Sequence, residues 1–335
     1  MYDTHGIPII QLIGFLHTMK NRKVMTMAAV LAAGMILATE CGSSAADSTG
    51  TDAAADSTAV TEEESADTSE TGVSEAENNE ESTEDSASAD GPLVIADQGI
   101  FSAGGITLTS EGTFNPEDHW EETGAGQTSH VDHANVLYQI PEDGTGLPMV
   151  FLHGYGQSRM GWMTTPDGRE GWSDMFLRMG HSVFLIDEPR RGEAGATSVS
   201  GEISTKTLDQ RWYTQFRIGR WENGESVPNE GSQFPNDEES LDQFFRQMTP
   251  DTGMTSDMGA DFDNETVARA VAATIDEVYD RTGKDSILVT HSQGGNCTVV
   301  DLPEEGITGN DHFMFQDLNN DVIAEHIENW IRQNV

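Results

Sequence analysis

A serine in the C-terminal half of the chain has the local sequence that a nucleophile needs. Ser292 stands in the run 290–294 (THSQG), directly after a short apolar segment. Where a chain turns sharply from a strand into a helix, a serine at the turn is lifted above the edge of the sheet. Gly294 and Gly295 supply the small residues that such a turn requires. The run lacks the first glycine of the G-x-S-x-G pattern, and a lone S-x-G is common by chance, so the assignment needs support from other residues.

A second run could stabilise the charge that attack by a serine creates. Residues 153–156 (HGYG) end another apolar segment, 148–153. A glycine-bearing loop in this position contributes a backbone N–H to an oxyanion hole, and the amide of Gln293 would be the other donor. Each fixed donor typically contributes about 3 kcal/mol, so this loop matters as much as the serine.

A serine hydroxyl is a weak nucleophile and needs an adjacent base. Of the ten histidines, His312 fits best, because it follows the serine in a loop, 309–312 (GNDH), before the last helix-forming segment. His291 neighbours the serine on a strand, where alternation should turn its side chain away. His326 lies in an amphipathic segment, which favours a packing role.

Apolar runs around these residues predict an α/β domain. The runs 148–153, 183–186 and 286–290 are typical of strands inside a parallel sheet that is covered on both faces. Apolar residues at helical spacing over 172–179 predict a helix that Gly180 ends. It lies between the strands at 148–153 and 183–186 and completes a strand, helix, strand unit.

Two further features extend this domain. An apolar stripe predicts a long helix over 265–279 that leads into the strand at 286–290. Short β-rich runs at 93–102, 105–111 and 133–140 predict antiparallel strands at the start of the domain.

An aromatic-rich stretch from Ser198 to Asp263 has no clear period. Its length and composition fit a cap over a substrate pocket. The alternative is an insertion whose aromatic residues pack only against one another. These residues are Trp212, Tyr213, Phe216, Trp221, Phe234, Phe244 and Phe245.

The first 41 residues read as a leader that includes a secretory signal. A basic start at 20–23 precedes an apolar run over 24–38 and then Cys41. This stretch resembles a bacterial lipoprotein signal, in which the cysteine receives a lipid anchor, although Glu40 replaces the usual small residue. An uncleaved anchor or ordinary signal cleavage is the alternative. Met19 is the more natural start of such a signal.

Residues 42–91 have the composition of a disordered linker. They contain fifteen Asp or Glu, no Lys or Arg and no aromatic residue. Such a segment cannot bury enough apolar surface to offset chain entropy, and its charges keep it extended. It would serve either as a tether for the domain at 92–335 or as a solubilising tail.

Charge and cysteine count exclude several classes of partner. The net charge is −41, and −26 remains outside the linker. So acidic a surface repels nucleic acid and anionic lipid headgroups. The only cysteines are Cys41 and Cys297, so lipidation of the first excludes an intramolecular disulfide. No metal-ligand motif occurs, and we expect neither a metal nor another cofactor.

Several segments of 92–335 together resemble a branch of bacterial secreted α/β-hydrolase esterases. That resemblance implies an α/β-hydrolase fold with Ser292 as nucleophile, His312 as base, and the amides of Tyr155 and Gln293 as oxyanion donors. In that branch adjacent cysteines can occupy the places of Tyr155 and Gly156, so a disulfide-stiffened loop is absent here. The segments are Pro148 to Gly195 (with Thr164 to Gly168, Gly171-Trp172 and Ile186-Asp187), His291 to Gln293, and Gly309 to Asn320.

The later strands of that fold do not fit into the chain. Only nineteen residues separate Ser292 from His312. Residues 297–302 read as a strand, yet a parallel crossover needs about a dozen residues, and only 293–296 intervene. A natural deletion, an error in the gene model, or an adapted smaller hydrolase would explain the gap, which falls between Gly295 and Val299. We favour the first two, because the missing piece includes the helix after the serine.

The missing piece would also carry the family's catalytic glutamate. The carboxylates left between the serine and the base are those of Asp301, Glu304, Glu305 and Asp311. Each could reach His312 in principle, but charged residues in loops are usually solvated.

Two functions therefore remain open. The first is a carboxylic-ester hydrolase that acts on a small molecule through an acyl-serine and is impaired by loss of the acid. The second is an inactive hydrolase-derived lipoprotein, at most a ligand-binding module. Either would be secreted and held at a bacterial cell surface or membrane by a lipid anchor, in an oligomeric state that the sequence leaves open.

Overall fold

The computed structural model describes residues 91–335 except 121–123, 200, 202, 204–207, 254–263 and 293–297. Before residue 91 it describes only the backbone of 9–12 and 14–15, and the backbone alone of 298–301. The predicted signal with Cys41, the predicted linker at 42–91 apart from its last residue, and the predicted donor Gln293 lie outside the described residues. The chain divides into two compact units, one of 1–34 with 93–335 and the other of 35–92.

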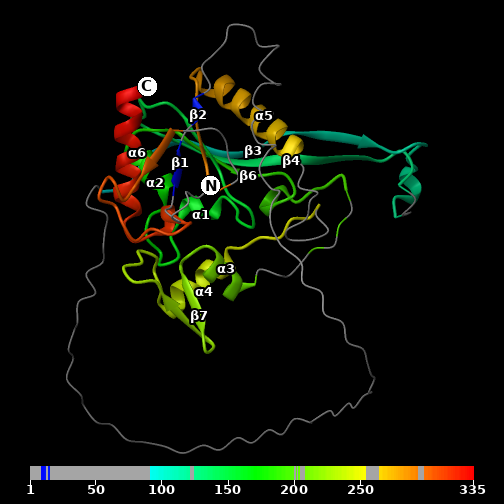
Figure 1. Cartoon of the computed structure of the whole chain (residues 1–335). Coiled ribbons are helices and arrows are strands. Elements are labelled where there is room, and N and C mark those ends of the chain that lie inside the picture. Colours follow the sequence, from blue (N-terminus) through cyan, green and yellow to red (C-terminus); the bar gives the residue numbers. More distant parts are fainter. Residues whose placement is uncertain are drawn as a thin grey trace, which may run out of the picture. The chain divides into compact units, whose positions relative to one another are not determined.

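A six-stranded sheet forms the centre of the domain, in the order β2-β9-β5-β6-β4-β3 (Figure 1). Strand β5 runs parallel to both β6 and β9, whereas β4 is antiparallel to β6 and β3. The predicted mixture of an antiparallel start and a parallel core is therefore confirmed. The strands are β2 (Gly14–Phe15), β3 (Ile95–Thr109), β4 (Thr128–Pro141), β5 (Met149–Leu152), β6 (Val183–Asp187) and β9 (Ile287–Thr290).

Helices cover both faces of this sheet because its central strands are apolar on both sides. Phe151 and Leu185 face one side and pack with helices α2 (Trp172–Arg178) and α6 (Asn320–Asn334). Their neighbours Val150 and Ile186 face the other side and pack with α5 (Asn264–Thr282). Alternation along a strand sends successive residues to opposite faces, so these runs form two hydrophobic cores.

The two predicted helices appear where their apolar stripes lie. Helix α2 is followed by Gly180 at φ +89°, the left-handed conformation in which a glycine commonly ends a helix. Helix α5 spans Asn264–Thr282 and buries Ala270, Val271 and Val278 along one stripe. The predicted α/β architecture, with helices on both faces of the sheet, is thus confirmed by the layers and the strand order.

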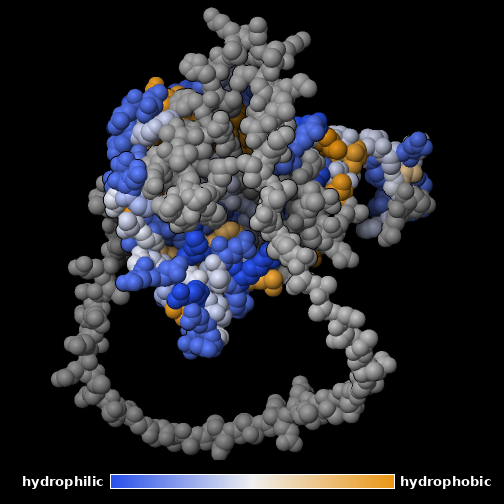
Figure 2. All heavy atoms as spheres, in the orientation of Figure 1, coloured by the Kyte–Doolittle hydropathy of each residue, from blue (hydrophilic) through white to orange (hydrophobic). Residues whose placement is uncertain are grey.

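Strands β3 and β4 form one long hairpin rather than the separate short strands predicted. Their pairing runs from Ile95–Pro141 to Thr109–Thr128. The hairpin extends well beyond the sheet, and its tip carries the short turn η1 (Pro116–Asp118) (Figure 1). Figure 2 shows apolar surface where the hairpin leaves the body of the domain. Its exposed apolar residues include Ile100, Ile106 and Leu108.

The stretch predicted as a cap contains two helices and a small hairpin. These are α3 (Asp209–Gln215), β7 (Gly219–Glu222), β8 (Glu225–Pro228) and α4 (Glu238–Arg246). Its aromatic residues do not pack only against one another. Trp212 stacks on Phe313 with ring centroids 6.0 Å apart, and Phe244 meets the same ring edge-on at 4.9 Å. The insertion therefore contacts the loop that carries His312.

The segment after the serine forms a strand that stays out of the main sheet. Strand β10 (Thr298–Asp301) lies within the predicted run 297–302 and pairs antiparallel with β1 (Ile9–Leu12). No parallel crossover from β9 is needed for such pairing. The outer edge of β9 pairs instead with β2, a strand from the predicted leader.

The remaining short elements are α1 (Met160–Met163), η2 (Gly192–Ala194) and η3 (Met314–Gln316). Within the part of the chain that the structure describes, no helix is both long and apolar enough to span a bilayer.

Candidate functional site

Ser292 lies two residues after strand β9 in a strained backbone conformation. Its φ is +62°, and it is exposed to solvent. A residue with a side chain rarely adopts positive φ, and such strain is concentrated at functional sites. The turn therefore has the character expected of a nucleophile at the carboxyl end of a parallel strand.

The residue before the serine connects β9 to the loop of the predicted base. The ring of His291 is buried, and its Nε2 lies 2.8 Å from the carbonyl oxygen of His312. Nδ1 lies 2.9 Å from Oε1 of the Gln157 side chain; because a neutral ring that donates from Nε2 accepts at Nδ1, the Gln157 amide must be turned so that its NH2 group faces the ring. A carbonyl can only accept, so Nε2 donates. Burial lowers the pKa of His291 to about 4, and the ring is neutral at pH 7.

His312 itself is held between aromatic rings. It stacks on Phe216 with centroids 4.7 Å apart, and its ring lies 4.6 Å from that of His291. Burial, with smaller contributions from His291 and Arg217, lowers the pKa of His312 to about 2. The structure thus brings the backbone of the predicted base beside the strand of the predicted nucleophile, and the imidazole is neutral.

None of the described carboxylates forms a hydrogen bond with the His312 ring. Glu304 and Glu305 are exposed, and the side chain of Asp301 lies outside the described residues. Asp311 is buried, but its Oδ1 accepts from the amide of Phe313. Burial, together with the nearby charge of Asp317, raises the pKa of Asp311 well above its ordinary value.

The predicted oxyanion loop follows β5 and depends on His153. Its Nδ1 lies 2.9 Å from the carbonyl of Gly154, and its Nε2 accepts from the amide of Glu188 at 3.2 Å. Because Nε2 accepts, the proton sits on Nδ1, which donates to Gly154. Burial lowers the pKa of His153 to about 3, consistent with a neutral ring.

Both glycines of this loop are required by their surroundings. A Cβ on Gly154 would lie 2.6 Å from Nδ1 of His291. Gly156 has φ +71°, and a Cβ there would lie 2.7 Å from the ring of Trp212. Close approach of the loop to β9 and to the insertion therefore excludes larger residues at these two positions.

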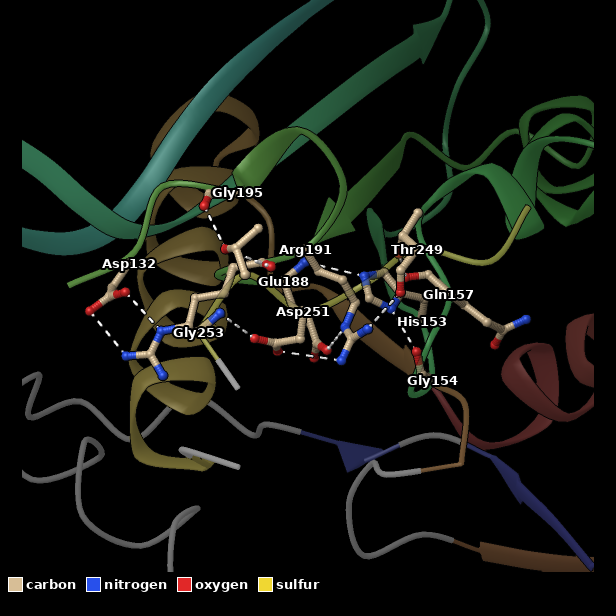
Figure 3. Close-up of polar contacts among 12 residues, drawn as sticks. Asp132, His153, Gly154, Gln157, Glu188, Arg191, Gly195, Thr249, Asp251 and Gly253 are labelled. Atoms are coloured by element: carbon tan, nitrogen blue, oxygen red, sulfur yellow. Dashed lines mark hydrogen bonds and ion pairs between the residues drawn. The ribbon is translucent and has the colours of Figure 1, made fainter. Parts of the chain in front are cut away.

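A buried ionic cluster lies beside the loop and was not predicted from the sequence. Arg191 is 1% exposed and donates from Nε to Oε1 of Glu188 at 2.9 Å and from Nη2 to Asp251 at 3.4 Å (Figure 3). Its guanidinium also lies over the ring of Tyr155, 4.9 Å from the centroid. Burial raises the pKa of Glu188 to about 7, against the opposing effect of Arg191.

A second buried pair lies next to this cluster. Arg190 donates to both carboxylate oxygens of Asp132, at 2.9 and 3.2 Å. Consecutive arginines after an acidic strand end, in the run 187–191 (DEPRR), were the only signal in the sequence for either pair. Among the described residues, no group of His, Cys, Asp and Glu is arranged to hold a metal ion.

Comparisons with known proteins give limited further information. No family model matches the chain. A segment of 76 residues is 38% identical to a protein of Fungal sp. (strain ATCC 74256) named "Probable secreted lipase phiG". That match covers 21% of this chain and 21% of the fungal protein, so the chain spans about a fifth of the length of this curated relative. A solved structure described as a novel bacterial esterase is 24% identical to this chain, with a TM-score of 0.48. The match covers 73% of this chain and 98% of the chain in that structure.

Proposed function

We propose that this chain is a carboxylic-ester hydrolase that acts on small-molecule esters through an acyl-serine intermediate. The observation that carries the proposal is the position of Ser292, at φ +62° two residues after the end of β9, a strand that runs parallel to β5. The hydrogen bond from His291 to the carbonyl of His312 supports it, because it joins that strand to the loop of the base. The fungal relative, a lipase by name, points to the same chemistry.

In this proposal the hydroxyl of Ser292 attacks the ester carbonyl and passes its proton to the neutral imidazole of His312. The oxyanion of the tetrahedral intermediate accepts hydrogen bonds from the amides of Tyr155 and Gln293. The intermediate collapses, and the alcohol leaves with the proton from His312. Water, deprotonated by the same ring, then releases the acid and restores the serine.

We expect this activity to be weak. A catalytic carboxylate fixes the histidine tautomer and stabilises the imidazolium, and its loss lowers turnover by about 10⁴-fold in other serine hydrolases. The pKa of His312, lowered by burial to about 2, is far below the value at which a general base works best at neutral pH. Binding and oxyanion stabilisation can still leave about 10³-fold over water when triad members are removed.

The test is release of nitrophenol from short-chain nitrophenyl esters by the purified protein and by Ser292→Ala. Weak turnover that disappears in Ser292→Ala, with fluorophosphonate labelling of the wild type alone, supports the acyl-serine mechanism. Robust turnover would contradict the impairment and direct attention to Asp301, Glu304, Glu305 and Asp311.

A second candidate function is an inactive, ligand-binding module. The absence of a hydrogen bond between the His312 ring and any described carboxylate favours it. Activity that is unchanged in Ser292→Ala would remove the esterase mechanism and leave this alternative.

The N-terminal assignments and the gap belong to the same proposal. The chain would be secreted and anchored by a lipid on Cys41, with residues 42–91 as a disordered tether for a catalytic domain at 92–335. A segment between Gly295 and Val299 would be missing by deletion or by an error in the gene model. Sequencing the DNA around codon 296 decides between a real deletion and an error.

A further inference from the structure

Residues 249–253, near the end of the stretch predicted as a cap, return to the predicted oxyanion loop. The backbone N–H of Thr249 donates to the carbonyl of Gly156 at 2.8 Å. The hydroxyl of the same residue donates to the carbonyl of Gln157 at 2.9 Å. One threonine thereby holds two consecutive peptide oxygens of the loop (Figure 3 shows its position beside Gln157).

The peptide bond between Gly154 and Tyr155, which carries the N–H of Tyr155, is held through its carbonyl oxygen. The carbonyl of Gly154 accepts from Nδ1 of His153 at 2.9 Å and from the backbone N–H of Gln157 at 3.2 Å. A trans peptide is planar, and its N–H points opposite to its C=O. Fixing the oxygen of Gly154 therefore fixes the direction in which the N–H of Tyr155 points.

Arg191 joins these two anchors. Its Nη1 donates to the carbonyl of Thr249 at 3.0 Å, while its guanidinium lies over the ring of Tyr155. Its Nε donates to Glu188, whose own amide donates to Nε2 of His153. The planar, rigid donor fork of an arginine can satisfy several directed contacts at once, which an ammonium group cannot do in the same way.

We propose that Arg191 and Thr249 are positioning residues for the oxyanion loop at 153–157. Arg191 holds the ring of Tyr155 and the carbonyl of Thr249, and Thr249 holds the carbonyls of Gly156 and Gln157. The N–H of Tyr155 is thereby kept in one orientation before substrate arrives. This inference rests on the proposed ester hydrolysis for its kinetic consequence, but the rigidity of the loop can be measured without any substrate.

A purely structural role for the segment 249–253 is the alternative, and a matched pair of variants separates the two. Thr249→Val removes the hydroxyl that holds Gln157. Thr252→Val removes a hydroxyl three residues later that donates to the carbonyl of Gly195 at 2.6 Å and lies 3.1 Å from the carbonyl of Arg190, away from the loop. Each substitution keeps the shape of the side chain and leaves the ionic cluster intact.

We expect a kinetic effect because an N–H donor stabilises the transition state only when it is accurately placed. A shift of about 1 Å can cost about 100-fold in rate. In Thr249→Val we expect kcat for nitrophenyl esters to fall about 10- to 100-fold with KM within about 2-fold, and Thr249→Ser to restore it. Thr252→Val lowers thermal stability but keeps kcat. Arg191→Lys, which keeps the charge and loses the fork, behaves as Thr249→Val.

Amide hydrogen exchange of peptides that cover 153–158 provides the second measurement. We expect it to accelerate at least about 10-fold in Thr249→Val and Arg191→Lys, but not in Thr252→Val, while exchange in β5 stays unchanged. Equal exchange and equal kcat in Thr249→Val and Thr252→Val would overturn the inference. If the wild type shows no turnover that depends on Ser292, the proposed function fails, and the exchange difference alone still decides whether these residues hold the loop.

Discussion

The imidazole of His291 donates a hydrogen bond from Nε2 to the backbone carbonyl of His312, at 2.8 Å. The residue before the predicted nucleophile therefore holds the loop of the predicted base. The same ring contacts the amide of Gln157 in the predicted oxyanion loop. A single buried histidine thus connects the three parts of the candidate site.

Replacing this histidine should loosen all three parts at once. In His291→Phe an aromatic ring is kept, but the carbonyl of His312 and the side-chain amide of Gln157 lose their partner. We expect unfolding free energy to fall by about 1–3 kcal/mol and kcat for nitrophenyl esters to fall about 10- to 100-fold. Chemical denaturation and steady-state kinetics measure the two effects. His326→Phe, the same change on α6, is the control, and an equal loss of kcat in both variants would contradict a connecting role.

The stabilising effect of His291 should depend on pH in a defined direction. Burial lowers its pKa from the ordinary 6.5 to about 4 in the folded state, so the unfolded chain binds the proton more readily. Its contribution is complete above about pH 6.5 and is lost as pH falls towards 4, with a slope of up to about 1.4 kcal/mol per pH unit. Urea titrations at pH 7.5, 6 and 5 should show the wild type lose its advantage over His291→Phe. A constant difference between the two proteins would refute this assignment.

The buried carboxylate of Asp317 should have the opposite pH dependence. Burial raises its pKa to about 7, although Asn310 and the amide of Asp311 donate to its Oδ2. Because the folded state binds the proton more tightly than the unfolded one, stability is lost as pH rises from about 4 through 7. Asp317→Asn should therefore be more stable than the wild type at pH 8.5 and nearly equal to it at pH 5.

Thermal melts of wild type, Asp317→Asn and the exposed control Asp321→Asn measure this difference. A loss of stability in Asp317→Asn that is equal at both pH values would mean that the ionised carboxylate is needed for its hydrogen bonds. The control should change little at either pH.

Lipidation of Cys41 would change the edge of the sheet as well as the location of the protein. Cleavage before Cys41 removes residues 9–15, and with them β1 and β2, which pair with β10 and β9. We expect a fatty-acid probe to label the wild type and not Cys41→Ser when the two are expressed in a bacterium. Equal labelling of the two, or labelling of neither, rejects the anchor.

Much of the fold could be predicted from the sequence because its signals are local. The apolar runs at 148–153 and 183–186 became adjacent parallel strands, since only residues that are apolar on both faces fit the middle of a covered sheet. The stripe at 172–179 became α2, and Gly180 follows it in the left-handed conformation that ends a helix. Each of these signals is contained in fewer than ten consecutive residues.

The sequence also located the turn at Ser292 but missed what surrounds it. The prediction that His291 points away from the serine rests on strand alternation, which describes one strand in isolation. Its contacts with Gln157 and His312 join residues 134 and 21 positions away. Strand alternation gives the direction of a side chain and carries no information about which loop will lie there.

Tertiary structure alone decided how the predicted oxyanion loop is held. Arg191 and Thr249 are 58 residues apart, and Asp251 is two residues further along the chain. As a sequence, Arg190 and Arg191 read as surface charge after a strand, because buried arginines are rare unless they are paired. Pairing depends on where the insertion returns to the domain, which is set by the packing of the whole molecule, so a buried ionic cluster leaves no periodic pattern in the chain.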